Sequence, residues 1–148
     1  MVIYNILAAK IYQTGGKLSM SAKQDRAVEL KNRTGDAHYN CAQAVACVFA
    51  EEAGLSSDTL RKMGACFGLG MGTMEATCGA LCGAQMVQGL VKFEGHNLRN
   101  SAAEMYKAFT EKCGGSLCKE LKGVGTGKVL CSCDDCVRNA VEILEQSL

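Results

Sequence analysis

The chain has 148 residues, the size of one domain, and a domain of this size buries about two-thirds of its unfolded surface. It contains no proline, only 5% aromatic residues, and a formal charge of +1 with no long run of one sign. This composition favours helices and argues against a nucleic-acid-binding protein. We therefore expect an all-α fold, a single-domain helical bundle of about six or seven helices.

Ten cysteines are far more than ordinary usage. In a small secreted protein they would indicate disulfides, but the first stretch lacks a basic segment before its short apolar run. No other apolar run approaches the ~20 residues that span a bilayer. We expect a cytoplasmic protein without membrane insertion, whose thiols stay mostly reduced and serve metal binding or redox chemistry.

Residues 1–19 differ from the rest of the chain, and Met20 is followed by the capping box that Ser21 and Gln24 form. Two interpretations stay open. In the first, 1–19 is a leader or mobile tail upstream of a true start at Met20, and 20–148 is a cysteine-rich helical domain. In the second, 1–19 forms an ordinary docked first helix.

Three helices are predicted before the centre of the chain, over about 21–33, 40–54 and 58–66. The first turns Ala27, Val28 and Leu30 inward. Asn40 is the expected N-cap of the second helix, which places Cys41 in its first turn. This helix is apolar almost all round, which is typical of a buried central helix.

The stretch GLGMGTMEATCGALCG over 68–83 joins a glycine-rich loop to a helix that should reach about residue 93. Thr77 is the expected N-cap, which places Cys78 in the first turn, where the helix dipole and free N–H groups favour a thiolate. Because glycine permits positive φ and close backbone approach, Gly70, Gly72 and Gly79 are the candidate cofactor contacts. The expected core residues of this helix are Met86, Val87, Leu90 and Val91.

The last third of the chain predicts three more helices. Ser101 opens a capping box for a helix that ends at Cys113, before two glycines. A short helix over 116–121 carries Cys118. The last helix begins at about Ser132, with Val137, Val141 and Leu144 as its apolar stripe.

Single cysteines are more often core residues than chemical groups, and this interpretation suits Cys47, Cys66 and Cys113. The tail cluster of Cys131, Cys133 and Cys136 is different. Its C-x-C-x-x-C spacing suits soft metals such as zinc, copper(I) or iron–sulfur clusters, and the alternative is a disulfide-prone loop.

Five segments together resemble the C_GCAxxG_C_C family of redox-active proteins: YNCAQ (39–43), FGLGMG (67–72), EATCGALCG (75–83), CKEL (118–121) and CVRNAV (136–141). The resemblance covers about residues 27–144. It implies that the four family cysteines are Cys41, Cys78, Cys118 and Cys136, with Cys131 and Cys133 as alternatives for the last. A related helical module in multihaem cytochromes is associated with an iron–sulfur centre, but this chain has no C-x-x-C-H and should carry no c-type haem.

The residues and the resemblance together predict a four-cysteine site that works by thiol/disulfide redox or by iron–sulfur electron transfer. Cys78 and Cys41 are the candidate reactive residues. Cys41, Cys78, Cys118 and Cys136 are the candidate ligands of a [2Fe–2S] cluster or, alternatively, of zinc. The alternative function is a structural zinc-binding or partner-binding helical domain without redox activity. An electron-transfer partner of unknown identity is implied, and a homodimer stays open.

Overall fold

The computed structural model describes residues 21–148, and the two interpretations of residues 1–19 with a start at Met20 lie outside the described residues. Over 21–148 the chain is all-α, and the only β-type pairing in this range is an isolated antiparallel bridge between Thr77 and Leu117. The predicted all-α single domain is confirmed. Within the same range, no helix is both long and apolar enough to cross a bilayer.

The helices, in chain order, are α2 (Ala22–Lys31), α3 (Cys41–Cys47), α4 (Ala50–Ala53), α5 (Ser57–Gly64), α6 (Gly68–Met71), α7 (Gly79–Lys92), α8 (Arg99–Cys113), α9 (Cys118–Leu121) and α10 (Cys133–Ser147). A 3-10 turn, η1 (Gly35–Ala37), separates α2 from α3.

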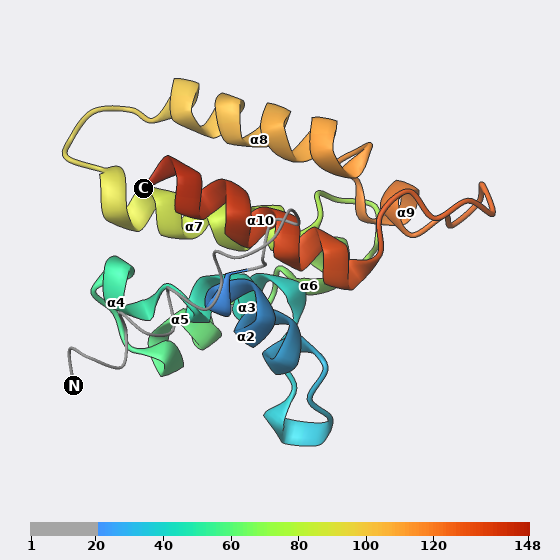
Figure 1. The fold of residues 1–148 in the computed structure, drawn as a ribbon, viewed down its shortest axis with the longest axis horizontal. Coiled ribbons are helices and arrows are strands. Elements are labelled where there is room, and N and C mark those ends of the chain that lie inside the picture. Colours follow the sequence, from blue (N-terminus) through green and yellow to red (C-terminus); the bar gives the residue numbers. More distant parts are fainter. Residues whose placement is uncertain (1–20) are drawn as a thin grey trace, which may run out of the picture.

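Two long helices, α7 and α10, pack against each other in the middle of the molecule (Figure 1). The third long helix, α8, packs on one side of α10, and α2 packs on the other side of α10. The short helix α3 lies across the start of α7 and also contacts α2, α5 and α10. The starts of α3, α7 and α10, together with α9, therefore gather at one end of the bundle.

The core consists of aliphatic and aromatic side chains that recur along these helices at helical spacing. Its largest fully buried members are Val45, Phe49, Leu60, Leu81, Val87, Phe109, Leu121, Val137, Val141 and Leu144. The predicted inward residues of α2 and the stripe of α10 are all buried. On α7 the prediction is correct for Val87 but wrong for Leu90 and Val91, which are 39% and 36% exposed.

Three helix starts or ends differ from the sequence prediction. The helix expected over 40–54 breaks after Val48, where Phe49 leaves helical geometry (φ −111°) and buries its ring in the core. The helix expected at Ser101 begins at Arg99, after Leu98, which offers no capping side chain. Cys78, rather than Thr77, is the N-cap of α7, because the backbone N–H of Cys78 donates to the carbonyl of Ser116 at 2.7 Å.

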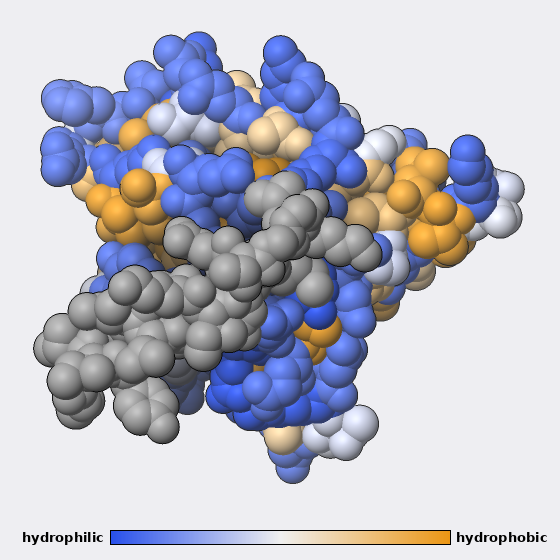
Figure 2. All heavy atoms as spheres, in the orientation of Figure 1, coloured by the Kyte–Doolittle hydropathy of each residue, from blue (hydrophilic) through white to orange (hydrophobic). Residues whose placement is uncertain are grey.

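After α9 the chain makes a glycine-rich loop that projects from the bundle before it returns to α10 (Figure 1). Its exposed apolar residues are Val124, Val129 and Leu130, at 51%, 61% and 43% exposure. Figure 2 shows apolar surface over this projection.

Candidate metal and redox centre

A cavity of about 720 Å³ opens at the end of the bundle where the starts of α3, α7 and α10 meet α6 and α9. Its lining is unusually rich in sulfur. The cysteines that line it are Cys41, Cys66, Cys78, Cys118, Cys131, Cys133 and Cys136, and all ten cysteines of the chain are free thiols.

Cys41 is held at the start of α3 by a reciprocal capping box. The side chain of Asn40 accepts from the N–H of Gln43 at 2.9 Å, and the side chain of Gln43 accepts from the N–H of Asn40 at 2.8 Å. The Asn40 amide also donates to the carbonyl of Gly64 at 3.0 Å. The cap thus ties α3 to the end of α5 and gives Cys41 a defined position at the cavity wall.

Cys78 and Cys118 are brought together by two short extended segments that pair before α7 and α9. Besides the bond from Cys78 to Ser116, the N–H of Cys118 donates to the carbonyl of Ala76 at 3.0 Å. The Lys119 ammonium forms an ion pair with Glu75 at 2.7 Å across the same junction. These contacts join two regions that are about 40 residues apart in the sequence.

The glycines of the central stretch allow the backbones to approach closely at this end. A Cβ built on Gly83 would lie 2.5 Å from the carbonyl oxygen of Ala42, so α7 contacts the backbone of α3 directly. A Cβ on Gly79 would lie 2.6 Å from the carbonyl of Phe67, and one on Gly70 would lie 2.7 Å from the Cβ of Cys118. Larger residues at these three positions would push the cavity walls apart.

The environment of Cys78 favours its thiolate. The Cys136 thiol lies beside the Cys78 sulfur, and the N–H groups of Ala80 and Leu81 at the start of α7 hydrogen-bond this sulfur. Together they lower the pKa of Cys78 although burial opposes the change. The neighbouring Cys113 and Cys78 sulfurs, together with burial, raise the pKa of Cys136, whose single S–H donates to the carbonyl of Cys131 at 3.8 Å.

The three tail cysteines, Cys131, Cys133 and Cys136, have different neighbours. Cys131 precedes Ser132, the N-cap of α10, whereas Cys133 and Cys136 lie in the first turn of the helix. Cys133, at the first position of α10, accepts a hydrogen bond from the Cys41 thiol. This bond lowers the pKa of Cys133 to about 5; burial opposes the shift, and the nearby Lys122 ammonium reinforces it. The proton stays on Cys41, whose pKa is raised by the bond to Cys133 and by burial.

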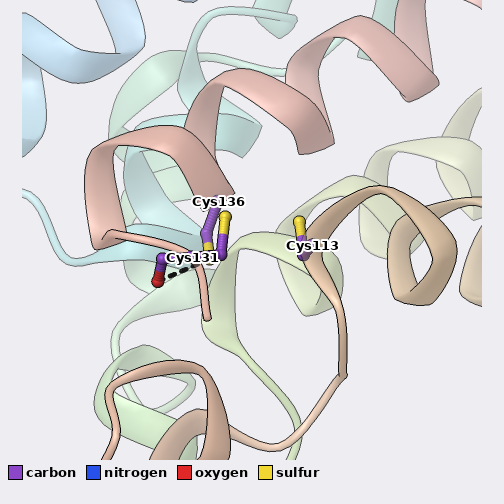
Figure 3. Close-up of side chains that lie close together, drawn as sticks. All are labelled: Cys113, Cys131 and Cys136. Carbon is purple, nitrogen blue, oxygen red and sulfur yellow. Dashed lines mark hydrogen bonds between the residues drawn. The ribbon is translucent and has the colours of Figure 1, made fainter. Parts of the chain in front are cut away.

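Cys131 and Cys136 instead face Cys113, at the end of α8 (Figure 3). The three sulfur atoms lie within 4.8 Å of one another, and the residues are 9%, 2% and 3% exposed. Three buried thiols at this spacing could hold a metal ion. The adjacent Cys136 thiol lowers the pKa of Cys113 to about 6, whereas burial raises the pKa of Cys131 to about 12.

The predicted site residues mostly line one cavity. Cys41, Cys78, Cys118 and Cys136 all line it, as do Gly72 and Gly79. Gly70 does not line it, but lies behind Cys118. Gly72 has open space around its Cα.

Sequence reasoning assigned three other cysteines to the core. This is correct for Cys47, which is 7% exposed and lies outside the cavity. It is wrong for Cys66, which is exposed and lines the cavity, because the chain leaves α5 there and turns into α6. Cys113 is buried as expected, but the cluster that it forms with the tail could not be recognised from a cysteine isolated in the sequence.

Two charged residues of the cavity, Lys122 and Lys31, were not predicted from the sequence. Lys122 follows α9 and lines the cavity near Cys133, with Lys31 from the end of α2 on the same cavity. No motif marks either lysine. The only available signal is that Lys122 follows Cys118 by one helical turn.

The comparisons with known proteins identify the family of the chain. No curated protein and no solved structure matches the chain. A family model described as "Putative redox-active protein (C_GCAxxG_C_C)" matches residues 39–147, which include every cysteine of the cavity and of the Cys113 cluster. The chain therefore belongs to the C_GCAxxG_C_C family.

Proposed function

We propose that the chain is an electron-transfer protein in which Cys41, Cys78, Cys118 and Cys136 hold an iron–sulfur cluster of the [2Fe–2S] type. The observation that carries this proposal is that these four thiols come from four different helices and line one cavity. Four thiolates are the usual ligand set of such a cluster. A family described as redox-active supports the same chemistry.

The residues around the cavity suit an anionic thiolate centre. The N–H groups of Ala80 and Leu81 hydrogen-bond the Cys78 sulfur, and Lys31 and Lys122 bring positive charge to the cavity. Hydrogen bonds to sulfur, burial and nearby charge are the features by which a protein sets the potential of a cluster. When bound, the cluster supplies one-electron transfer.

The rim of the cavity supports contact with an electron-transfer partner. Leu69 and Met71 line the cavity and are 45% and 50% exposed, on a segment with left-handed φ values of +53° and +57°. Exposed apolar side chains on the same cavity as Lys122 would give a partner a small contact surface at the mouth of the site.

The test is anaerobic purification or reconstitution with iron and sulfide, followed by absorbance and elemental analysis. We expect visible charge-transfer absorbance, about two iron and two sulfide ions per chain, and a paramagnetic signal after one-electron reduction. Cys78→Ser should lose all three, whereas Cys47→Ser should retain them, because Cys47 is buried outside the cavity. Stoichiometric zinc without iron in the native protein would contradict the proposal and support a structural zinc domain.

A second candidate is dithiol/disulfide chemistry between Cys41 and Cys133, favoured by the hydrogen bond between them. The Cys133 thiolate and the Cys41 thiol would lose two electrons and one proton to a two-electron acceptor, such as a low-molecular-weight disulfide, and form one S–S bond. Mass spectrometry after oxidation of the metal-free protein should then find a Cys41–Cys133 cross-linked peptide. Its absence after full oxidation would exclude this candidate.

A further inference from the structure

The cluster of Cys113, Cys131 and Cys136 extends beyond the four predicted ligands. Cys113 ends α8, Cys131 precedes the cap of α10, and Cys136 lies in the first turn of α10 (Figure 3). Only Cys136 belongs to the proposed four-cysteine set.

A polar side chain is directed at these sulfurs. The Asn139 amide donates to the Cys113 sulfur at 3.3 Å and to the Cys131 sulfur at 3.8 Å. Asn139 lies one turn after Cys136 on the same helix, so α10 supplies both a thiol and this donor. An amide donor shared between two sulfurs stabilises negative charge on them, as the residues behind a metal ligand commonly do.

The spacing fits three-coordinate binding. An ion about 2.3 Å from each of three sulfurs in a plane would hold them about 4.0 Å apart. The three sulfurs already lie within 4.8 Å of one another, so only small side-chain rotations are needed. Within residues 21–148, no further histidine, cysteine or acidic ligand joins this group.

The number of ligands selects among thiophilic ions. Thiolates favour zinc, iron–sulfur clusters and copper(I), but structural zinc and iron–sulfur sites take four protein ligands. Of the three, copper(I) is the ion that suits a buried set of three thiolates.

The group of Cys113, Cys131 and Cys136 borders a second cavity as well as the main one. Cys131 also lines a second cavity, of about 560 Å³, together with Asn139 and Lys112. The Lys112 ammonium pairs with Glu142 at 2.6 Å on this cavity. An ion that enters this second cavity meets Cys131 and Asn139 without passing Cys41, Cys78 or Cys118, none of which lines it.

We propose that Cys113, Cys131 and Cys136 form a second metal site, which binds a soft monovalent ion of the copper(I) type in three-coordinate thiolate geometry. This metal site shares Cys136 with the proposed iron–sulfur cluster, but it does not depend on the iron–sulfur cluster being present. Asn139 is its positioning residue.

The experiment is a competition titration of the reduced full chain with copper(I) under anaerobic conditions, against a chromophoric chelator. Wild type should bind one tight equivalent, and X-ray absorption should report three sulfur neighbours. Cys113→Ser and Cys131→Ser should each weaken binding at least ~10-fold, because each removes a ligand. Asn139→Leu should weaken binding by about 10–100-fold with the stoichiometry unchanged.

Two matched variants distinguish this site from the main cavity. Cys47→Ser replaces a buried cysteine outside both sites and should bind copper(I) like wild type. Cys118→Ser should also retain the copper site, although it should lose the iron–sulfur cluster. Circular dichroism of each variant checks that the helices remain.

Tight binding that survives in both Cys113→Ser and Cys131→Ser would overturn the proposal, as would a two- or four-sulfur coordination shell. Loss of copper(I) in Cys118→Ser would place the ion in the main cavity and would also overturn it. Neither result bears on iron–sulfur binding. Conversely, failure of cluster assembly in wild type with a retained copper site would reject only the proposed function.

Discussion

At the scale of single residues, the cysteines differ in state because each thiol has a different neighbour. Cys41 and Cys136 keep their protons because their pKa values are raised, whereas Cys133, Cys113 and Cys78, which lie beside them, have lowered pKa values and ionise more easily. Local sequence cannot distinguish Cys131 from Cys133, since they are two residues apart. The neighbouring Cys41 lowers the pKa of Cys133, whereas burial raises the pKa of Cys131.

Cys133 should be the first thiol of the cavity to react in the reduced, metal-free protein. Because its pKa is lowered to about 5, its thiolate is already formed near neutral pH. We expect alkylation of Cys133 by iodoacetamide to change less than about 2-fold between about pH 6 and pH 8. Peptide mass spectrometry at short reaction times measures this.

Cys47 is the comparison, since burial raises its pKa to about 11 and it should stay unlabelled over the same range. Lys122→Met should slow alkylation of Cys133 at the acidic end, because the substitution removes a charge that favours the thiolate. A Cys133 rate that rises about 10-fold per pH unit throughout would contradict the prediction.

A second prediction at this scale concerns two glycines with similar backbone strain. Gly70 and Gly72 have φ values of +55° and +77°, so alanine at either should cost about 1–2 kcal/mol of unfolding free energy. Only at Gly70 would the new Cβ collide with Cys118. Gly70→Ala should therefore also impair metal or cluster binding, whereas Gly72→Ala should not. Equal metal content in the two variants would show that the Cys118 contact is unimportant.

At the scale of elements, three helix starts and one short helix carry the cysteine-rich end of the bundle. Two different devices fix them. Capping side chains at Asn40 and Ser132 begin α3 and α10; the sequence predicts the cap at Asn40 and a helix start at about Ser132. The start of α7 is fixed instead by the bond from Cys78 to Ser116, a residue that lies beyond α8.

The close contact of α3 with α7 should be sensitive to any side chain at Gly83. Because a Cβ there would lie 2.5 Å from the Ala42 carbonyl, Gly83→Leu should lower the free energy of unfolding by about 1–3 kcal/mol through overpacking. Chemical denaturation measures the change. Gly89→Ala is the matched control on the same helix: nothing lies near its Cα, so alanine should stabilise by up to about 1 kcal/mol. If both variants unfold like the parent, the helices do not approach as described.

At the scale of the whole molecule, α10 joins the parts of the chain that meet at the site. It packs against α2, α3, α7 and α8, and its first turn bears Cys133 and Cys136. Ion pairs also connect it to α2, the first described helix: Lys31 with Asp134 at 2.8 Å and Asp25 with Arg138 at 2.8 Å.

The pair of Lys31 and Asp134 should make a small contribution to stability that depends on pH. The hydrogen bond from Lys31 lowers the pKa of Asp134, so this stability is present above the unfolded-state pKa of about 3.9 and is lost as pH falls through the lower folded-state value. Asp134→Asn should cost about 0.2–1 kcal/mol near pH 7 and nothing once the carboxyl of the parent is protonated. Urea denaturation near pH 7, and again at a pH low enough to protonate the Asp134 carboxyl, measures this difference.

The exposed pair of Asp58 and Lys62 provides the control, since both side chains are more than 70% exposed. Asp58→Asn should change stability by less than Asp134→Asn at neutral pH. An Asp134→Asn effect that persists unchanged into strong acid would indicate a cause other than the ion pair.

Sequence alone determined the helical class, the caps at Ser21 and Asn40, and the buried stripe of α10, because propensity, capping and helical periodicity are local properties. It also singled out Cys41, Cys78, Cys118 and Cys136 through local motifs and a family resemblance. These four line one cavity, which no single motif specifies.

Only the tertiary structure decided which thiols touch. Cys113 and Cys131 lie beside Cys136 because α8 and α10 pack together, and Cys133 reaches Cys41 because α10 crosses the start of α3. Contacts between residues far apart in the chain depend on the packing of whole helices, which leaves no periodic signal around the residues concerned. For the same reason, the break at Phe49 and the cap at Cys78 could not be predicted, since each is set by a distant partner: the core that buries the Phe49 ring, and the carbonyl of Ser116.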